Sequence, residues 1–342
     1  MQEKNIKKMR VGFVGRGTLG RDVLKGLIDN ENIEIPFVIN CRVTPEVGAG
    51  RDVFEKMALD NNIPFHFSNT LNADKWISYI REQNVDLVVA MLWLDTIGEE
   101  VISGARLGFL NLHGGMLPRY RGNACSNWAI LNKEDQQGLS VHLMEAGKLD
   151  SGPVVLQEII PMTDRTTIKE LMDHIDKRGA ELVLQAVGMI VRDEYTLTSQ
   201  NEEKALRCYP RLPRDGEINW HDAAEKIERL IRAAGDPYPG AYSFYSDVRD
   251  EGRIKKMTIC SAHIEEHPTE FCAVPGHVLK IQDDLKRAVV CGDMKLLVLD
   301  EIRIDGISSD PVSSFRTVRQ RMGLDTEILL NELWKLKERL NA

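Results

Sequence analysis

Three side chains that could together move an acyl group stand close to one another in the sequence. The run from Asn111 to Gly122 is Asn-Leu-His-Gly-Gly-Met-Leu-Pro-Arg-Tyr-Arg-Gly, and Asp150 follows in a Leu-Asp-Ser-Gly tract. An amide donates hydrogen bonds, an imidazole exchanges a proton near neutral pH, and a carboxylate can orient an imidazole. Asn111, His113 and Asp150 are therefore candidate catalytic residues for passing an acyl group to an amine.

This chemistry assigns a task to each side chain. Attack of a neutral amine on a carbonyl builds negative charge on the oxygen, which the Asn111 amide can hold. His113 can donate a hydrogen bond to that oxygen or accept the proton of the amine, and both tasks stay open. Asp150 would hold the imidazole and raise its basicity. The plain alternatives are a polar pair in a turn for Asn111 and His113, and a turn residue for Asp150.

The surrounding sequence predicts how these residues are positioned. The apolar run 108–113 ends in two glycines, which is typical of a buried strand that enters a tight turn. Residues two apart on a strand face the same side, so Asn111 and His113 should point together at the strand's carboxyl end, where open α/β sheets bind ligands. Strand-like runs alternate with amphipathic segments as far as about Val155, which predicts a Rossmann-like, mostly parallel sheet. The predicted strands are 11–15, 35–39, 85–92, 109–113, 139–144 and 154–159.

The second part of the chain has a different pattern. A capping box at Thr167 and Glu170 begins a helix that should run to about Val191, and the polar stretch 196–205 predicts a linker. We therefore divide the chain into a catalytic domain, 1–204, and a C-terminal domain, 205–342. In the latter, closely spaced strand candidates predict a small barrel. Its other expected features are a helix with an apolar stripe at Ile227, Leu230, Ile231 and Ala234 that stops at Gly235, strands 242–245, 257–264, 277–281, 288–291 and 295–302, and a terminal amphipathic helix, 324–340.

Composition limits the classes of function. With 342 residues, 43% of them hydrophobic, the chain can bury two cores. A formal net charge of −8 argues against a protein whose main partner is a nucleic acid. The N-terminus lacks the apolar segment of a signal peptide and no stretch is long enough to span a membrane, so we expect a cytoplasmic protein with no membrane partner. The six cysteines are scattered, so we expect free thiols and no metal.

The motifs together resemble the signature of the N10-formyltetrahydrofolate-dependent formyltransferases, and most of all the sugar-nucleotide N-formyltransferases. In that family an Asn-x-His strand end is followed by Leu-Pro-x-Tyr-Arg-Gly, here 117–122, and by Asp-x-Gly, here 150–152. The tracts 213–220 and 236–241 look like the join and first helix of the family's C-terminal domain. The resemblance implies catalysis by Asn111, His113 and Asp150, N10-formyltetrahydrofolate as co-substrate and an OB-like C-terminal domain.

The resemblance also implies two sets of binding residues. The folate would lie between Met91, Leu92, Trp93 and Leu94 on one side and Ala146, Gly147 and Leu149 on the other, although Trp93 could equally pack in the core. The amine substrate would meet Gly15, Arg16, Gly17, Thr18, Arg119, Tyr120 and Arg121.

The loop from Gly15 to Gly20 also fits a dinucleotide-binding fingerprint. However, the run 38–42 lacks the acidic residue that would hold an adenosine ribose. Backbone N–H groups at a helix start hold any phosphate, so a nucleotide-sugar is the preferred ligand, and a tight turn without a ligand stays open.

The chain departs from the family pattern at two places in the signature. Gly115 stands where a serine is common, and Cys125 lies in a tract where many relatives have proline. Acyl transfer through the three candidate residues needs no thiol. His142, on the predicted strand 139–144, lies outside the family pattern and is assigned a structural role. The departures at Gly115 and Cys125 bear on the acceptor and on the shape of the pocket.

The acceptor is inferred from what the sequence lacks. The loop 41–51 carries only Arg42 and Arg51 against Glu46, without the lysine-rich insertion of tRNA formyltransferases. Together with the 236–241 tract, this favours a nucleotide-linked aminosugar, as used in lipopolysaccharide O-antigen biosynthesis. The alternatives are a methionyl-tRNA formyltransferase, a formyltetrahydrofolate hydrolase and a non-catalytic folate-binding protein. An apolar strand of the small domain could pair across a homodimer.

Overall fold

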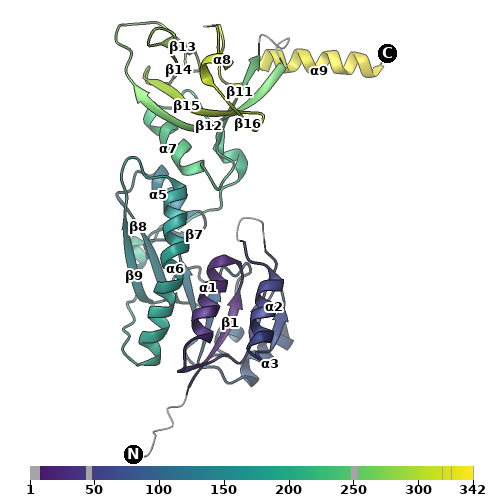
Figure 1. Cartoon of the computed structure of the whole chain (residues 1–342), viewed down its shortest axis with the longest axis vertical. Helices are drawn as coiled ribbons and strands as arrows, with labels where there is room; N and C mark the ends of the chain where they lie inside the picture. Colours follow the sequence, from purple (N-terminus) through teal and green to yellow (C-terminus); the bar gives the residue numbers. More distant parts are fainter. Residues whose placement is uncertain (1–7, 44–47, 248–252, 318, 325, 342) are drawn as a thin grey trace, which may run out of the picture. The chain divides into compact units, whose positions relative to one another are not determined.

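The computed structural model describes residues 8–43, 48–247, 253–317, 319–324 and 326–341 (Figure 1). Contacts divide the chain into two compact units. The first contains Met1–Ala129, Asp135–Thr163 and Glu170–Pro210, and the second contains Ile130–Glu134, Asp164–Lys169 and Arg211–Ala342. The domain boundary between residues 204 and 205 stays a prediction. Within the described ranges, no helix is both long and apolar enough to cross a membrane.

The first unit is built on one large sheet, whose strands follow the order β4-β3-β1-β5-β6-β8-β9 with β2 beside β1. The strands from β4 to β6 are parallel, whereas β8 and β9 are antiparallel to their neighbours. The predicted Rossmann-like, mostly parallel sheet is therefore confirmed. The strands are β1 (Met9–Gly15), β2 (Ile33–Glu34), β3 (Val38–Asn40), β4 (Phe65–Phe67), β5 (Leu87–Met91), β6 (Phe109–His113), β8 (Gln136–Leu143) and β9 (Val154–Pro161).

Two details of this sheet differ from the sequence-based prediction. The expected strand 35–39 is shorter and begins later, as β3 (Val38–Asn40), and a separate strand β2 lies before it, because Pro36 between them cannot donate a ladder hydrogen bond. The strand β4 was not predicted, because three residues are too few to show a period. A separate pair of two-residue strands, β7 (Arg121–Gly122) and β10 (Arg207–Cys208), joins distant parts of the chain.

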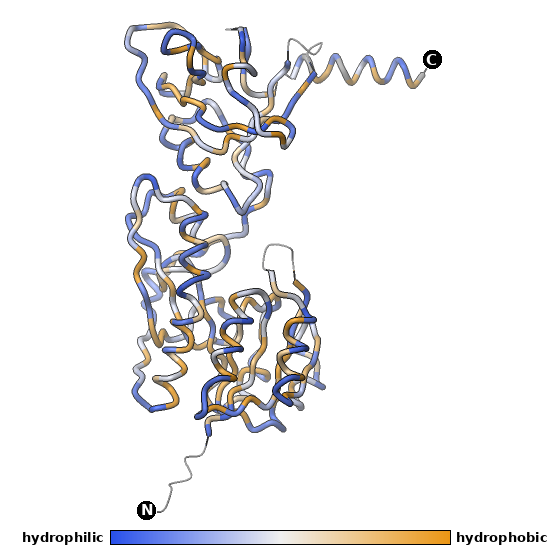
Figure 2. Tube along the Cα trace, in the orientation of Figure 1, coloured by the Kyte–Doolittle hydropathy of each residue, from blue (hydrophilic) through white to orange (hydrophobic). Residues whose placement is uncertain are grey.

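Helices cover the faces of this sheet, and hydrophobic and hydrophilic residues alternate along them (Figure 2). In α1 the buried side chains recur every three or four residues, from Leu19 to Leu27. The long helix α6 packs against β6 and β9. Its Gly179 lies close to the side chain of Leu112 on β6, and its Arg178 pairs with Glu158 on β9. The helices are α1 (Gly17–Ile28), α2 (Arg51–Asp60), α3 (Asp74–Glu82), α4 (Glu99–Ile102), α5 (Cys125–Leu131) and α6 (Ile168–Val191), and the last of these matches its prediction.

The second unit is a curled antiparallel sheet that encloses a core with α7 (Ala224–Ala234). Helix α7 ends at Gly235 and buries Ile227 and Ile231, as the apolar stripe predicts. A register shift at residues 259–262 of β12 bends the sheet. The strands are β11 (Ala241–Asp247), β12 (Arg253–Glu265), β13 (Val278–Ile281), β14 (Lys286–Val290), β15 (Leu296–Ile304) and β16 (Ile307–Ser309), and the sheet order is β11-β12-β15-β14-β13 with β16 beside β15.

Short helical segments complete the chain: two 3-10 helices at Glu202–Lys204 and Pro213–Gly216, together with α8 (Pro311–Ser314) and α9 (Thr326–Asn341). The terminal helix was predicted over 324–340, of which Asp325 lies outside the described residues. An antiparallel β domain is confirmed, whereas closure into an OB-like barrel stays a prediction.

Candidate active site

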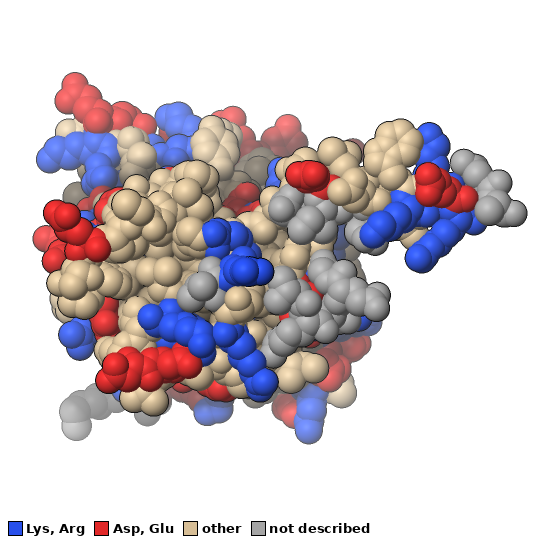
Figure 3. All heavy atoms as spheres, turned by 90° about the horizontal axis from the view of Figure 1, so that it is seen from above, with Lys and Arg blue, Asp and Glu red and all other residues tan. Residues whose placement is uncertain are grey.

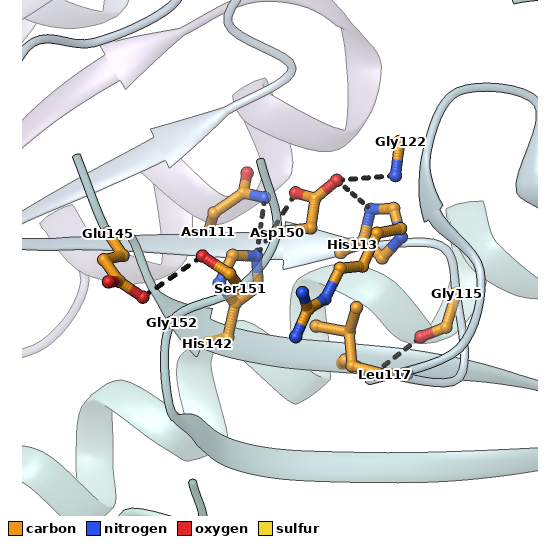
Figure 4. A network of polar contacts seen from close by, with 12 residues as sticks. Asn111, His113, Gly115, Leu117, Gly122, His142, Glu145, Asp150, Ser151 and Gly152 are labelled. Carbon is orange, nitrogen blue, oxygen red and sulfur yellow. Dashed lines mark hydrogen bonds and ion pairs between the residues drawn. The ribbon is translucent and has the colours of Figure 1, made fainter. Parts of the chain in front are cut away.

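Strand β6 brings Asn111 and His113 to the carboxyl edge of the first unit's sheet. His113 is buried and Asn111 is half-buried, and both lie on the same face of the strand (Figure 4). The neighbouring strand β8 places His142 directly opposite Asn111. The amide Nδ2 of Asn111 lies 3.2 Å from Nε2 of His142. His142 therefore belongs to the same polar cluster, although the sequence analysis assigned it a structural role.

Asp150 lies between the two imidazoles. Its backbone adopts the left-handed conformation, with φ of 52°, in the turn between β8 and β9. One carboxylate oxygen lies 3.5 Å from Nδ1 of His113 and accepts a 2.8 Å hydrogen bond from the backbone N–H of Gly122. The other oxygen lies 3.6 Å from Nε2 of His142. The structure thus brings the three predicted catalytic residues together and adds His142 to them (Figure 4).

Backbone carbonyls determine which nitrogen of each ring carries a proton. Nε2 of His113 lies 2.6 Å from the carbonyl oxygen of Tyr120, and Nδ1 of His142 lies 2.9 Å from that of Leu143. A carbonyl oxygen only accepts, so the hydrogen-bond network assigns the proton to each of these nitrogens. The second nitrogen of each ring, Nδ1 of His113 and Nε2 of His142, then faces Asp150. A proton that arrives on either of these second nitrogens lies beside a negative charge.

Burial and charge have opposite effects on this cluster. Burial lowers the pKa of His113 below its ordinary value, and the charge of Asp150 and the hydrogen bond to Tyr120 offset this only in part. Burial would raise the pKa of Asp150, but the interactions of its carboxylate with His142, His113 and the Gly122 N–H outweigh it, so the pKa is lowered. At neutral pH the cluster therefore holds an ionised Asp150 beside a neutral His113, and a neutral imidazole can accept a proton.

Comparison with protein families shows where this arrangement belongs. The model of the formyl transferase family matches residues 13–187, which include all four side chains of the cluster. The model of the formyl transferase C-terminal domain matches residues 212–317. The chain belongs to the formyl transferase family.

Solved structures of low sequence identity share the fold of this formyltransferase. WlaRD, a sugar 3N-formyl transferase crystallised in the presence of dTDP and 5-N-formyl-THF, is 17% identical, with a TM-score of 0.59 over 85% of this chain and 97% of that chain. An N-formyltransferase from Helicobacter canadensis, in complex with folinic acid and dTDP-3-aminofucose, is 16% identical, with a TM-score of 0.60 over 85% and 99%. HypX from Aquifex aeolicus is 18% identical, with a TM-score of 0.54, and is matched over 96% of this chain and 50% of its own length.

The segment 196–205 of the formyltransferase is not the free linker that its polar sequence predicts. The side-chain amide of Gln200 donates to the carbonyls of Asp150 and Gly152, at 2.8 and 2.7 Å. Its oxygen accepts from Arg121, which also pairs with Glu202 at 2.8 Å. These bonds hold the turn that contains Asp150 against the turn formed by residues 117–122, which we call the signature turn. Gln200 cannot be recognised as a site residue from the sequence, because its polar surroundings show no period that would indicate a buried contact.

The predicted substrate residues of the signature turn have different environments. Arg121 is 8% exposed and its guanidinium is occupied by Gln200 and Glu202. Tyr120 buries its ring and offers its carbonyl to His113. Arg119 is exposed, and its guanidinium lies over the Tyr120 ring, 5.6 Å from the centroid. Of these three residues, Arg119 presents its side chain at the surface.

The predicted folate-lining residues include three exposed apolar side chains. Leu92 and Leu94 follow β5, whose Ala90 pairs with Asn111, and Leu149 directly precedes Asp150. Their exposed fractions are 38%, 42% and 39%. Of the other predicted folate-lining residues, Met91 is buried, Ala146 is half-buried, and Gly147 is exposed in the turn 145–148. Trp93 packs partly against the core. Its indole N–H is buried and has no hydrogen-bond partner.

The glycine loop between β1 and α1 is bound tightly to its own chain. The N–H groups of Arg16 and Gly17 donate to the carbonyls of Met91 and Ala49, each at 3.1 Å. The buried guanidinium of Arg16 donates to the carbonyls of Leu92 and Arg42. In the loop that begins at Gly15, two of the backbone N–H groups predicted to hold a phosphate therefore already donate to carbonyls of the chain. The half-buried Thr18 follows them. Glu46 and its neighbours in the 41–51 loop lie outside the described residues.

A metal has no evident place in this site. Within the part of the chain that the structure describes, no group of three or more histidine, cysteine, aspartate or glutamate side chains could hold a metal ion.

Gly115 should control the position of the His113 ring. A Cβ atom at residue 115 would lie 2.5 Å from Nε2 of His113 and 2.3 Å from the Tyr120 carbonyl oxygen. We expect Gly115→Ala to lower the free energy of unfolding by about 1–3 kcal/mol, as overpacking does, and to shift the His113 ring signals in an NMR spectrum. In Gly114→Ala, the matched control, the new Cβ meets only an ordinary contact at 3.5 Å, and we expect a change of less than about 1 kcal/mol. Equal stability and equal His113 signals in both variants would contradict this geometry.

The titration of His113 tests the electrostatics of the cluster. Because burial lowers its pKa, His113 should be half-protonated below pH 6.5, which NMR of isotope-labelled imidazoles can measure. In Asp150→Asn the charge that raises this pKa is gone, so the midpoint should move to still lower pH. The matched control Asp300→Asn removes the charge beside His263 and should lower the pKa of that ring alone. A rise of the His113 midpoint in Asp150→Asn would show that the assignment is wrong.

Proposed function

We propose that this formyltransferase transfers a formyl group from N10-formyltetrahydrofolate to the amino group of a nucleotide-linked aminosugar. One observation carries the proposal. Asn111, His113 and Asp150 converge at the carboxyl edge of the sheet, with a hydrogen-bond donor, a neutral base and its stabilising carboxylate in contact. Acyl transfer to an amine requires these three functions.

The residues beside the cluster fit a folate donor. A pteridine is flat and largely apolar at its faces, and Leu92, Leu94 and Leu149 expose apolar surface beside the strand ends that carry the cluster. The buried indole N–H of Trp93 has no partner, and a buried donor of this kind is normally satisfied by protein, water or ligand. Apolar walls with a few fixed polar groups are typical of small-molecule sites. When bound, the donor would supply the formyl carbonyl.

Each of the three catalytic candidates has a separate task in the transfer of the formyl group. Asn111 uses one amide N–H toward His142, and the second N–H can stabilise negative charge on the formyl oxygen. The proton of His113 is held on Nε2 by Tyr120, so Nδ1 is the atom that accepts the proton lost by the amine. Asp150 then stabilises the charged ring. This geometry favours the base task for His113 over donation to the oxyanion.

Two observations support a small anionic acceptor. The neighbours WlaRD and the Helicobacter canadensis enzyme were crystallised with dTDP and with dTDP-3-aminofucose. The chain has a net charge of −8, and on the face of the second unit drawn in Figure 3 basic and acidic side chains are interspersed. A tRNA acceptor would call for a continuous basic surface. A place in O-antigen synthesis, a cytoplasmic location and a homodimer stay predictions.

An acceptor panel tests the substrate. The purified chain is incubated with N10-formyltetrahydrofolate and, separately, nucleotide-linked aminosugars, charged initiator tRNA or no acceptor, and the products are analysed by mass spectrometry. We expect an aminosugar to gain one formyl group because the site holds a base for an amine. Formylation of the tRNA alone would replace the acceptor in the proposal. Formate release that needs no acceptor would indicate a hydrolase.

Kinetics of single variants test the division of work. Asn111→Ala should lower kcat by about 100- to 1,000-fold, as loss of an oxyanion donor does, and His113→Ala by at least about 100-fold through loss of the base. His174→Ala is the matched control, because this histidine lies on α6 and pairs with Glu158. It should leave kcat unchanged. Full activity of the His113→Ala variant would support a non-catalytic folate-binding protein instead.

A further inference from the structure

The thiol of Cys125 touches the hydrogen bond that orients His113. Its sulfur lies 2.9 Å from the Tyr120 carbonyl oxygen and 3.6 Å from Nε2 of His113. The thiol and the imidazole therefore donate to the same carbonyl.

A second thiol lies against the first. The pairing of β10 with β7 places Cys208 opposite Gly122, and the N–H of Asn123 donates to the Cys208 carbonyl at 3.2 Å. The sulfur of Cys125 lies 3.4 Å from the Gly122 carbonyl on the same short strand. The side chains of Cys125 and Cys208 lie close enough for each to affect the pKa of the other, and both are free thiols, 5% and 4% exposed.

The surroundings make the two sulfurs chemically unequal. The neighbouring Cys125 side chain and the charges of Arg207 and Arg119 lower the pKa of Cys208, although burial opposes them. The neighbouring Cys208 side chain and burial raise the pKa of Cys125. A thiolate is the form that reacts with oxidants, so Cys208 is the more reactive sulfur and Cys125 is a thiol within reach of it.

We propose that Cys125 and Cys208 form a redox modification site, in which a peroxide converts the two thiols into a disulfide next to His113. The Cys208 thiolate attacks one peroxide oxygen, the O–O bond breaks, and a sulfenic acid and a hydroxide form. The hydroxide takes up the proton that the Cys208 thiol lost on ionising and becomes one water. The sulfur of Cys125 then attacks the sulfur of Cys208, the S–S bond forms, and a second water leaves. The two cysteines lose two hydrogens together, and hydrogen peroxide is reduced to two molecules of water.

The disulfide would change the imidazole's surroundings. An S–S bond of about 2.0 Å is shorter than any contact between two separate sulfurs, so Cys125 must move toward Cys208. It also loses its S–H, so the Tyr120 carbonyl keeps His113 as a donor but loses the thiol. Oxidation should therefore shift the position and the pKa of the ring that the proposed function uses as its base.

Peptide mapping tests the modification without any activity assay. The full chain is treated with graded hydrogen peroxide, its remaining thiols are alkylated after denaturation, and the digest is analysed by mass spectrometry without reduction. We expect one linked peptide pair that joins Cys125 to Cys208, two hydrogens lighter than the sum of its parts, which a dithiol reductant separates. The exposed Cys272 gauges the dose, because it is oxidised irrespective of the pair. If Cys272 is oxidised while Cys125 and Cys208 remain alkylated, the modification site does not exist.

Matched variants and the His113 signal test the coupling. Cys208→Ser should abolish the link and keep the His113 imidazole signals constant in peroxide, whereas Cys291→Ser, at another buried cysteine, should behave as the unmodified sequence. In the parent chain the link should shift the His113 signals reversibly. Formation of the link without such a shift would overturn the coupling to the site.

The consequence for catalysis is the one part of this inference that rests on the proposed function. Formyl transfer should fall at least about tenfold on oxidation, a change of about 1.4 kcal/mol in the barrier, and recover with reductant. Cys208→Ser should retain its activity in peroxide. If no acceptor is ever formylated, the proposed function fails, while the peptide map and the His113 signals still decide the modification site.

Discussion

Asp150 carries its negative charge in a mostly buried position, and the groups around it stabilise that charge. A buried charge is costly unless polar groups around it offset the loss of water. Here the carboxylate has two imidazoles and the Gly122 amide as partners. Both imidazoles are themselves held by backbone carbonyls at their far nitrogens. The same arrangement that keeps Asp150 ionised therefore leaves one nitrogen of His113 ready to take a proton.

That requirement explains features of the chain that lie outside the cluster. The signature turn must return the Tyr120 carbonyl to His113, and a glycine at 115 leaves the space that this hydrogen bond needs. The Asp150 turn must stay in register with Gly122, and Gln200 holds it there from a segment fifty residues further along the chain. Arg121 completes this support by holding Gln200. A residue can thus be essential to the geometry of a site without facing any ligand.

Much of this could be predicted from the sequence, because the decisive signals were local. The period of two along 109–113 placed Asn111 and His113 on one face, and the alternation of strand-like and amphipathic runs predicted the parallel sheet. His142 was missed because its place depends on which strand pairs with β6 and in which register. Gln200 was missed because a polar stretch without periodicity looks like a linker. Contacts of this kind depend on tertiary structure, and no local sequence pattern predicts them.

Gly115 and Cys125 also show that a contact can depend on tertiary structure alone. In the sequence they are ten residues apart and look independent. In the structure both meet the one hydrogen bond between His113 and the Tyr120 carbonyl, the glycine by leaving space and the cysteine by donating to the same oxygen. A serine at 115 would crowd the imidazole that a thiol at 125 now accompanies. The two positions are therefore best understood as one local solution for holding His113, because both act on the hydrogen bond between its ring and the Tyr120 carbonyl.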